Sequence, residues 1–92
     1  MEKNSNWEVY IIQAESGKLY TGITTDLDKR FANHLRGSKG ARFFRFSRPK
    51  CILYREKLNN RSEATRREHA IKKMSRKQKL ELIHAFLLLS VV

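Results

Sequence analysis

The sequence has little cysteine, proline or glycine, the residues that cross-link, bend or loosen a small fold. Its 92 residues include one cysteine, one proline and four glycines. The single cysteine, Cys51, excludes an internal disulfide and a four-cysteine zinc site, and we interpret it as a small core residue in a reducing cytoplasm. The chain also lacks the roughly 18 consecutive apolar residues of a membrane span and the apolar N-terminal stretch of a secretion signal. These absences favour a cytoplasmic protein with one small core and no membrane partner.

Acidic residues are also few, since nine Asp and Glu stand against twenty Lys and Arg and the net charge is +11. Residues 1–35 hold four basic and five acidic residues, whereas residues 36–57 hold eight basic and one acidic, and residues 61–79 hold eight basic and two acidic. This distribution favours a basic surface that lies along the phosphates of a nucleic acid. The alternative is a solubilising surface. A membrane-surface helix is disfavoured because Pro49 and several turn residues interrupt the first basic segment.

A chain of this length makes one domain, residues 1–92, with a core over about residues 6–85. Runs of β-branched and aromatic residues predict three strands, and capping signals followed by apolar periodicity predict three helices. The strands are expected at residues 8–13, 18–23 and 50–58, and the helices at residues 25–36, at 62–74 and from 75 onward. The order β-β-α-β-α-α predicts an α/β fold, a small sandwich with a three-stranded, mainly antiparallel sheet flanked by helices.

The first two predicted strands are separated by a segment that favours a three-residue hairpin loop, Glu15–Gly17. With that loop, Tyr10 pairs with Gly22, and the side chains of Tyr10 and Tyr20 emerge on the same face of the sheet. Gly22 would then leave an open groove beside the Tyr10 phenol.

Capping residues and apolar spacing predict how the three helices begin and which sides they bury. The expected caps are Thr25 with Asp28, Ser62, and Ser75 with Gln78. The expected core-facing side chains are Leu27, Phe31 and Leu35, then Ala64, Ile71 and Met74, then Leu80, Ile83, His84, Leu87 and Leu88. The apolar residues 85–92 are expected to be a buried helix end, with a homodimer contact as the alternative.

Several residues are unusual for a purely structural protein. Glu68 lies on the inward side of the second helix, where a carboxylate costs several kcal/mol unless it is paired or holds a cation. It is either an ion-pair partner of a neighbour such as Arg67 or a ligand of Mg²⁺, which needs only one or two protein carboxylates. Arg30 is either a surface residue or a phosphate clamp. Tyr10 and Tyr20 are either half-buried strand aromatics or hydroxyl donors to a water or phosphate oxygen.

These residues together resemble the GIY-YIG nuclease superfamily. Val9–Ile11 stands where the first motif belongs, with valine in place of its glycine, and Tyr20–Gly22 stands where the second belongs. Residues 20–34 resemble the segment that follows, with its arginine and histidine, and residues 66–73 resemble the helix that carries the metal-binding glutamate. The match covers about 80 of the 92 residues and is most similar to small bacterial proteins made of this domain alone.

The resemblance implies an endonuclease-like protein that hydrolyses DNA phosphodiester bonds with one divalent cation, in DNA repair or recombination. It implies that Glu68 binds Mg²⁺ or Mn²⁺ and that Arg30 neutralises charge in the transition state. Tyr10 and Tyr20 would position the attacking water, with Tyr10 as the favoured base. His34 would assist by hydrogen bonding or share the role of base.

Basic residues outside this site are expected to bind DNA phosphates without reading sequence. They are Lys39, Arg42, Arg45, Arg48, Arg67, Lys72 and Lys73. Phenylalanines in the same loop, Phe43, Phe44 and Phe46, are expected either to stack on unpaired bases or to pack under the loop. No glycine-rich phosphate loop or dinucleotide fingerprint is present, so no small-molecule cofactor is expected. The alternative function is a non-catalytic DNA- or RNA-binding module that keeps the nuclease fold.

Overall fold

The computed structural model of the chain describes residues 5–36 and 47–91. In these residues the elements follow the predicted order, and each lies close to its predicted range. They are β1 (Glu8–Ala14), β2 (Leu19–Thr24), α1 (Leu27–Arg36), β3 (Pro49–Lys57), α2 (Arg61–Lys72) and α3 (Arg76–Val91). The predicted α/β fold with a three-stranded antiparallel sheet is therefore confirmed.

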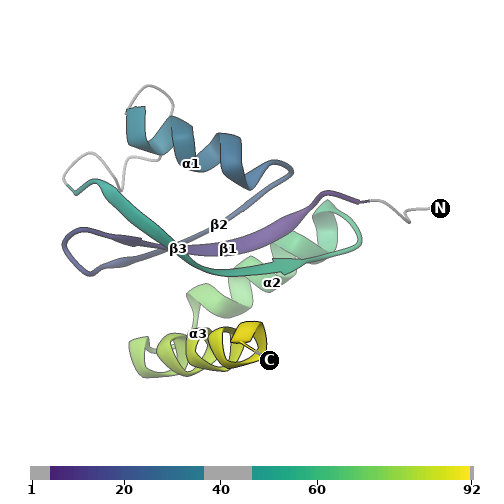
Figure 1. The fold of residues 1–92 in the computed structure, drawn as a ribbon. Coiled ribbons are helices and arrows are strands. Elements are labelled where there is room, and N and C mark those ends of the chain that lie inside the picture. The colour runs from purple at the N-terminus through teal and green to yellow at the C-terminus, as the bar shows by residue number, and fades with distance from the viewer. Residues whose placement is uncertain (1–4, 37–46, 92) are drawn as a thin grey trace.

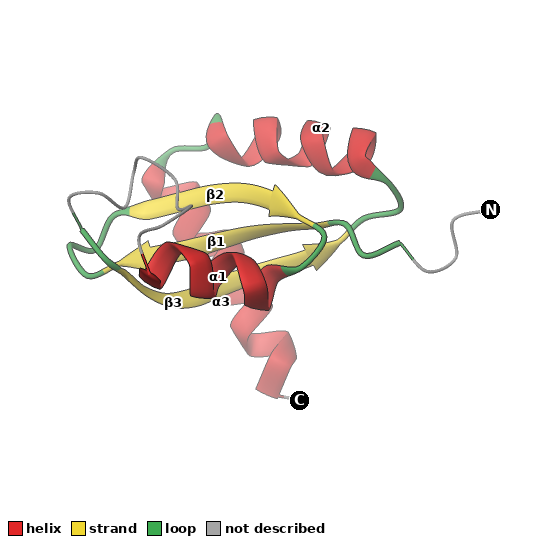
Figure 2. Cartoon of the chain, turned by 90° about the horizontal axis from the view of Figure 1, so that it is seen from above, coloured by secondary structure: helices red, strands yellow, loops and turns green. Residues whose placement is uncertain are grey.

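The strands form one antiparallel sheet in the order β2-β1-β3. Helix α1 covers one face of this sheet, and α2 and α3 cover the other (Figure 1). The view from above shows that α2 runs along the side of the sheet where β2 lies (Figure 2). The central strand β1 is buried on both faces, which explains its nearly continuous apolar sequence.

The β1–β2 hairpin has the predicted loop and register. Gly17 adopts a positive φ of 93°, and its amide donates to the carbonyl of Ala14 at 2.9 Å. Tyr10 pairs with Gly22 in this register. The confirmed loop length fixes which side chains share a face, since side chains alternate along each strand.

The first turns of α1 and α2 differ from the prediction. The side chain of Asp26, not Thr25, accepts a hydrogen bond from the amide of Lys29 at 3.1 Å. Asn60, not Ser62, accepts from the amide of Glu63 at 2.9 Å. In both cases the Ser or Thr hydroxyl is replaced by an Asn or Asp side chain, which caps at least as well. The reciprocal bonds between Ser75 and Gln78 at the start of α3 are confirmed.

The buried side of α1 contains a residue that the apolar pattern missed. Leu27 is 1% exposed and Phe31 packs beside it, as predicted, but Leu35 is 39% exposed. His34 takes its place in the interior, with 2% of its surface exposed. A seven-residue step falls closer to two full helical turns than an eight-residue step, so His34 lies nearer than Leu35 to the direction of Leu27.

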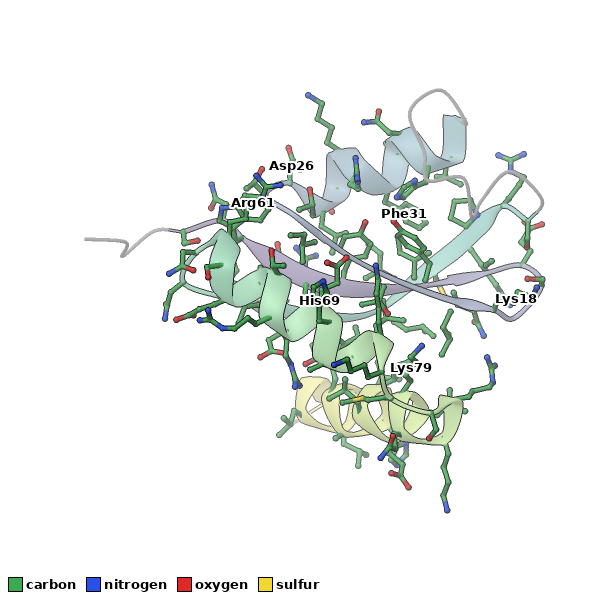
Figure 3. All side chains as sticks on the ribbon, turned by 180° about the vertical axis from the view of Figure 1, so that it is seen from behind. Lys18, Asp26, Phe31, Arg61, His69 and Lys79 are labelled. Atoms are coloured by element: carbon green, nitrogen blue, oxygen red, sulfur yellow. The ribbon has the colours of Figure 1, made fainter. Side chains whose placement is uncertain are left out.

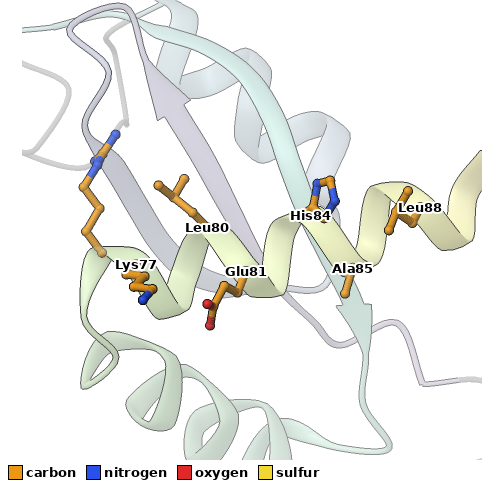
Figure 4. Close-up of a pocket in the computed structure, with 7 residues that line it drawn as sticks. Lys77, Leu80, Glu81, His84, Ala85 and Leu88 are labelled. Atoms are coloured by element: carbon orange, nitrogen blue, oxygen red, sulfur yellow. The ribbon is translucent and has the colours of Figure 1, made fainter.

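Helix α3 also turns a different side to the core. Leu82, Ile83 and Phe86 pack against the sheet, whereas the predicted core residues Leu80, Leu87 and Leu88 and the predicted core histidine His84 are exposed. Its outer side contributes to a hollow of about 780 Å³, and Figure 4 shows residues that line this hollow along the helix. Leu89 is 77% exposed, so the prediction of a buried helix end is wrong for the described residues. The homodimer contact stays a prediction.

In the part of the chain that the structure describes, no helix combines the length and apolar character needed to cross a membrane. Cys51 lies in β3 as a half-buried free thiol, so the expected core position is met only in part.

Candidate active site

The centre of the candidate site is the phenol of Tyr10. Strand β1 places this side chain on the α1 face, fully buried, opposite Gly22 of the edge strand β2. A Cβ atom at position 22 would lie 2.6 Å from the Tyr10 hydroxyl and 2.8 Å from its Cζ atom. The predicted open groove is therefore wrong, because the phenol itself fills the space above Gly22. The glycine allows the hydroxyl to reach toward the β2 edge.

Two aromatic side chains continue the site from Tyr10 toward α1. The ring of Tyr20 lies 6.3 Å from that of Tyr10, centroid to centroid, and 5.8 Å from the imidazole of His34, which it meets edge to face. Tyr10 and Leu27 belong to the buried cluster on this face, and Tyr20 and Phe31 pack against that cluster. The predicted placement of Tyr10 and Tyr20 on one face is confirmed, and α1 brings His34 to the same place.

Arg30 lies beside the Tyr10 hydroxyl. Burial raises the pKa of Tyr10 to about 12, and the nearby guanidinium of Arg30 opposes this rise. Nevertheless, within the described residues neither the Tyr10 hydroxyl nor the Arg30 Nε makes a hydrogen bond of standard geometry, although both atoms are buried. Leaving such groups unpaired costs about 1–3 kcal/mol each. Buried polar atoms without such a partner need an explanation, and a bound ligand or ion is one that a functional site provides.

The same burial affects His34. Desolvation, with a smaller contribution from the charge of Arg30, lowers the pKa of its imidazole below the usual 6.5. Burial therefore favours the neutral form of the His34 imidazole.

Glu68 approaches this centre from α2, on the other side of the sheet. Its carboxylate is close enough to Tyr10 to raise the pKa of the phenol. The side chain is 16% exposed and pairs with Lys72 at 3.2 Å, whereas the expected partner, Arg67, binds Glu56 at 2.9 Å. An ion pair four residues apart on a helix contributes only about 0.3–0.5 kcal/mol, so a ligand can displace the half-exposed Lys72 ammonium.

A metal ion in the described part of the chain would rest on few protein ligands. No group of three or more His, Cys, Asp or Glu side chains comes together there. Glu68 is the acidic side chain that acts on the buried Tyr10 hydroxyl. One carboxylate fits Mg²⁺ or Mn²⁺, which keep several waters, and does not fit Zn²⁺ in a site closed by protein.

Arg30 also connects the buried centre to solvent. It lines a polar hollow of about 370 Å³ at the start of α1. The other lining residues are Thr24, Thr25, Asp26, Lys29 and Asn33. Sequence reasoning missed this hollow, although its residues adjoin Arg30 in the sequence and include the helix cap. Its hydroxyls, amide and cations suit a phosphate group next to Arg30.

The predicted nucleic-acid-binding residues are dispersed in the structure. Lys39, Arg42, Arg45 and the three loop phenylalanines lie outside the described residues. Arg48 and Lys73 are exposed, Lys72 binds Glu68, and Arg67 binds Glu56. Their role in DNA binding stays a prediction.

Comparison with known proteins matches this arrangement. Residues 6–81 match the GIY-YIG catalytic domain. The UPF0213 protein DP2720 of Desulfotalea psychrophila is 48% identical over 79 residues, which cover 86% of this chain and 72% of that protein. The UPF0213 protein SH2523 of Staphylococcus haemolyticus is 45% identical over 75 residues, which cover 82% of this chain and 90% of that protein.

Solved structures agree with the fold. The protein EF2693 from E. faecalis has 36% sequence identity and a TM-score of 0.64, over 96% of this chain and 93% of that one. The UPF0213 protein BH0048 from Bacillus halodurans has 35% identity and a TM-score of 0.56, over 86% of this chain and 83% of that one. Members of the GIY-YIG family are generally endonucleases that use a divalent metal, and the motif residues of this chain lie on β1, β2, α1 and α2 around one phenol. The chain therefore belongs to the GIY-YIG family, among its small UPF0213 proteins.

Proposed function

We propose that this protein is a metal-dependent endonuclease that hydrolyses DNA phosphodiester bonds, in repair or recombination. One observation carries the proposal. The buried Tyr10 hydroxyl and Arg30 Nε have no hydrogen bond of standard geometry among the described residues, Arg30 lines a polar hollow, and the charge of Glu68 acts on the phenol. A phosphate in that hollow would supply the missing partner of Arg30.

Arg30 would bind a non-bridging oxygen of the scissile phosphate. Negative charge grows on these oxygens as the attacking oxygen bonds to phosphorus, and a fixed guanidinium stabilises that charge more in the transition state than in the ground state. Its short path to solvent through the hollow lets DNA reach it from outside.

The protein side chains would also position the water and receive its proton. The water oxygen bonds to phosphorus, the bond from phosphorus to the leaving oxygen breaks, and the water proton passes to a base. Tyr10 is our candidate because its hydroxyl is central and Arg30 lowers its pKa against the effect of burial. His34, neutral and in ring contact with Tyr20, is placed to share this role. A phenol with a pKa of about 12 needs further positive charge to act near neutral pH.

Glu68 would hold the divalent ion, Mg²⁺ or Mn²⁺, after Lys72 moves aside. The ion supplies Lewis acidity at the phosphate and positive charge near the phenol. Glu68 comes from α2 and Arg30 from α1, so a scissile phosphate would be bound from both sides of the β2 edge.

The binding contacts available on this surface favour phosphates over bases. Such contacts position a nucleic acid without reading its sequence, so we expect little base preference. This property supports a role on damaged or branched DNA, where structure rather than sequence marks the target.

The test uses purified protein with nicked, branched and single-stranded DNA and with RNA, in Mg²⁺, Mn²⁺ or chelator. We expect cleavage of DNA with either ion, and losses of about 10³-fold in Glu68→Gln and about 10²–10³-fold in Arg30→Ala, with binding retained. The matched control for the acid is Glu56→Gln, which removes another carboxylate that is paired with a cation.

Cleavage that survives Glu68→Gln would come from a contaminant and would contradict the proposal. DNA or RNA binding without cleavage by the wild-type protein would identify a binding module in which the Glu68–Lys72 pair is structural.

A further inference from the structure

A second cluster of cations lies where α3 meets the β1–β2 hairpin. Arg76 Nη2 donates a hydrogen bond to the carbonyl of Gly17 at 3.1 Å, which holds the start of α3 against the hairpin. Lys18, Arg76 and Lys79, with Leu19, line a hollow of about 230 Å³ at this junction. Figure 3 shows Lys18 at the hairpin and Lys79 on α3. We call the three cations the hairpin cluster.

We propose that the hairpin cluster is a second phosphate-binding surface, which holds the backbone of the DNA that the active site cleaves. The proposal rests on the proposed function for its substrate. None of the three residues belongs to the basic residues singled out from the sequence. Lys18 and Arg76 are 58 positions apart, so only the fold brings them to one hollow.

The charges of the cluster are not balanced by the protein. Among the described residues, no acidic side chain lines the hollow, and none of the three cations forms an ion pair. Like charges gathered around one hollow repel each other, and an anion between them removes that cost. The structural role of holding the hairpin needs one N–H of Arg76 and neither lysine. The remaining donors of the guanidinium and the two ammonium groups are available to phosphate oxygens.

The cluster also lies along a direct line from the active site. Strand β2 is an edge of the sheet, and Lys18 comes immediately before it, four residues from Gly22. At about 3.4 Å per residue these positions are roughly 14 Å apart. Each strand of a duplex carries one phosphate for about every 3.4 Å of helix axis. A duplex whose axis runs along β2 would therefore bring phosphates about four nucleotides from the cleaved bond to the cluster.

On the other side of β2, helix α2 leads from Glu68 to Lys72 and then to the start of α3. The β2 edge thus has cations at its two ends, since the hollow of Arg30 includes Thr24 and the hollow of the hairpin cluster includes Leu19. DNA that follows this edge would pass both hollows. Among the described residues that line them, Asp26 is the acidic one, and its side chain caps α1.

The experiment measures DNA binding by Lys18→Gln/Lys79→Gln, which keeps the Arg76 contact with the hairpin. The charge-matched control is Lys50→Gln/Lys57→Gln, which removes two exposed lysines from β3, the opposite edge of the sheet. We expect the cluster variant to bind a duplex roughly tenfold more weakly at moderate salt. Its slope of log affinity against log salt should be smaller by about 2, since two phosphate contacts are lost, and the control should change far less. Circular dichroism checks that both variants fold.

Substrate length locates the contact. Duplexes that extend about ten nucleotides on both sides of the cleaved bond should distinguish wild type from the cluster variant, and duplexes that stop within about three nucleotides on one side should not. An unchanged salt slope, or a defect independent of length, would overturn the proposal. Tight binding of inorganic phosphate that the same variant loses would assign the cluster to a small anion and would overturn it as well. Binding is read separately from cleavage, so a protein that binds through the cluster but does not cleave contradicts only the proposed function.

Discussion

The two faces of the sheet each bury a tyrosine, and they treat its hydroxyl in opposite ways. Tyr54, on the face covered by α2 and α3, donates to the carboxylate of Glu56 at 2.6 Å, and Glu56 in turn accepts from Arg67 at 2.9 Å. Tyr10, on the α1 face, is buried completely, and its hydroxyl makes no standard hydrogen bond within the described residues. Burial raises the pKa of both phenols.

The difference indicates what each face is for. On the face with Tyr54, the phenol, Glu56 and Arg67 pair with one another beside an apolar cluster. The buried Thr21 hydroxyl on the same face has no standard hydrogen bond among the described residues. On the face with Tyr10, the phenol hydroxyl and the Arg30 Nε are buried without a standard hydrogen bond, and the guanidinium of Arg30 offsets part of the cost for the phenol. Such a cost is typical of a site whose partner is a ligand. Matched substitutions on the two faces test this difference.

The largest expected effect is on activity in Tyr10→Phe. If Tyr10 positions water and takes its proton, cleavage should fall by about 10²–10⁴-fold. The free energy of unfolding should stay the same or rise slightly, because the removed hydroxyl has no standard hydrogen bond to lose. Cleavage rates and urea denaturation of the same preparation measure both effects.

Tyr54→Phe is the matched control and should show the reverse. It removes a hydrogen bond to a carboxylate, so the free energy of unfolding should fall by about 1–2 kcal/mol, while cleavage stays near the wild-type rate. Loss of stability in Tyr10→Phe with no loss of activity would make the α1 face an ordinary core.

The sequence predicted which residues lie near Tyr10 better than it predicted their burial and their ion pairs. Loop length and strand alternation were enough to place Tyr20 beside it, because these depend on local geometry. Burial of His34 was missed because the apolar pattern favoured Leu35 at the neighbouring position. That Arg67 binds Glu56 and not Glu68 depends on the packing of α2 against β3, which spacing alone does not give. The Glu68–Lys72 pair, in contrast, has the local four-residue spacing of a helix.

In the helices, too, local features were predicted better than features that depend on tertiary contacts. α3 is apolar on nearly all sides, so its sequence could not tell Leu82 and Phe86, which pack on the sheet, from Leu80 and Leu88, which do not. The cap of α3 was predicted because Ser75 and Gln78 form a local signal. Where the deciding contact is tertiary, as on this helix, the pattern fixes the element but not its orientation.

The second prediction compares two glycines on the hairpin. In Gly22→Ala, the new methyl would meet the Tyr10 hydroxyl at 2.6 Å and a Tyr20 ring carbon at 3.2 Å. We expect a loss of about 1–3 kcal/mol in the free energy of unfolding from overpacking, together with a loss of cleavage as the phenol moves.

Gly17→Ala is the control that introduces backbone strain without displacing the Tyr10 hydroxyl. Gly17 has φ of 93°, and a Cβ there would meet nothing within 4 Å. The variant should lose about 1–2 kcal/mol through backbone strain alone, with normal cleavage per folded molecule. Normal cleavage in Gly22→Ala would show that the exact place of the Tyr10 hydroxyl is unimportant.

The smallest expected effect is a pH dependence of stability on the α1 face. Burial lowers the pKa of His34, so below about pH 6.5 the unfolded chain takes up a proton that the folded chain refuses. The stability associated with the neutral imidazole is present above the unfolded pKa and is lost as the pH falls toward the folded one. Between about pH 7.5 and pH 5, the free energy of unfolding should therefore fall more steeply for wild type than for His34→Gln. His84→Gln, on the exposed side of α3, should keep the wild-type slope. Parallel slopes for wild type and His34→Gln would mean that the imidazole is solvated, and the contrast between the two faces would then rest on Tyr10 and Arg30 alone.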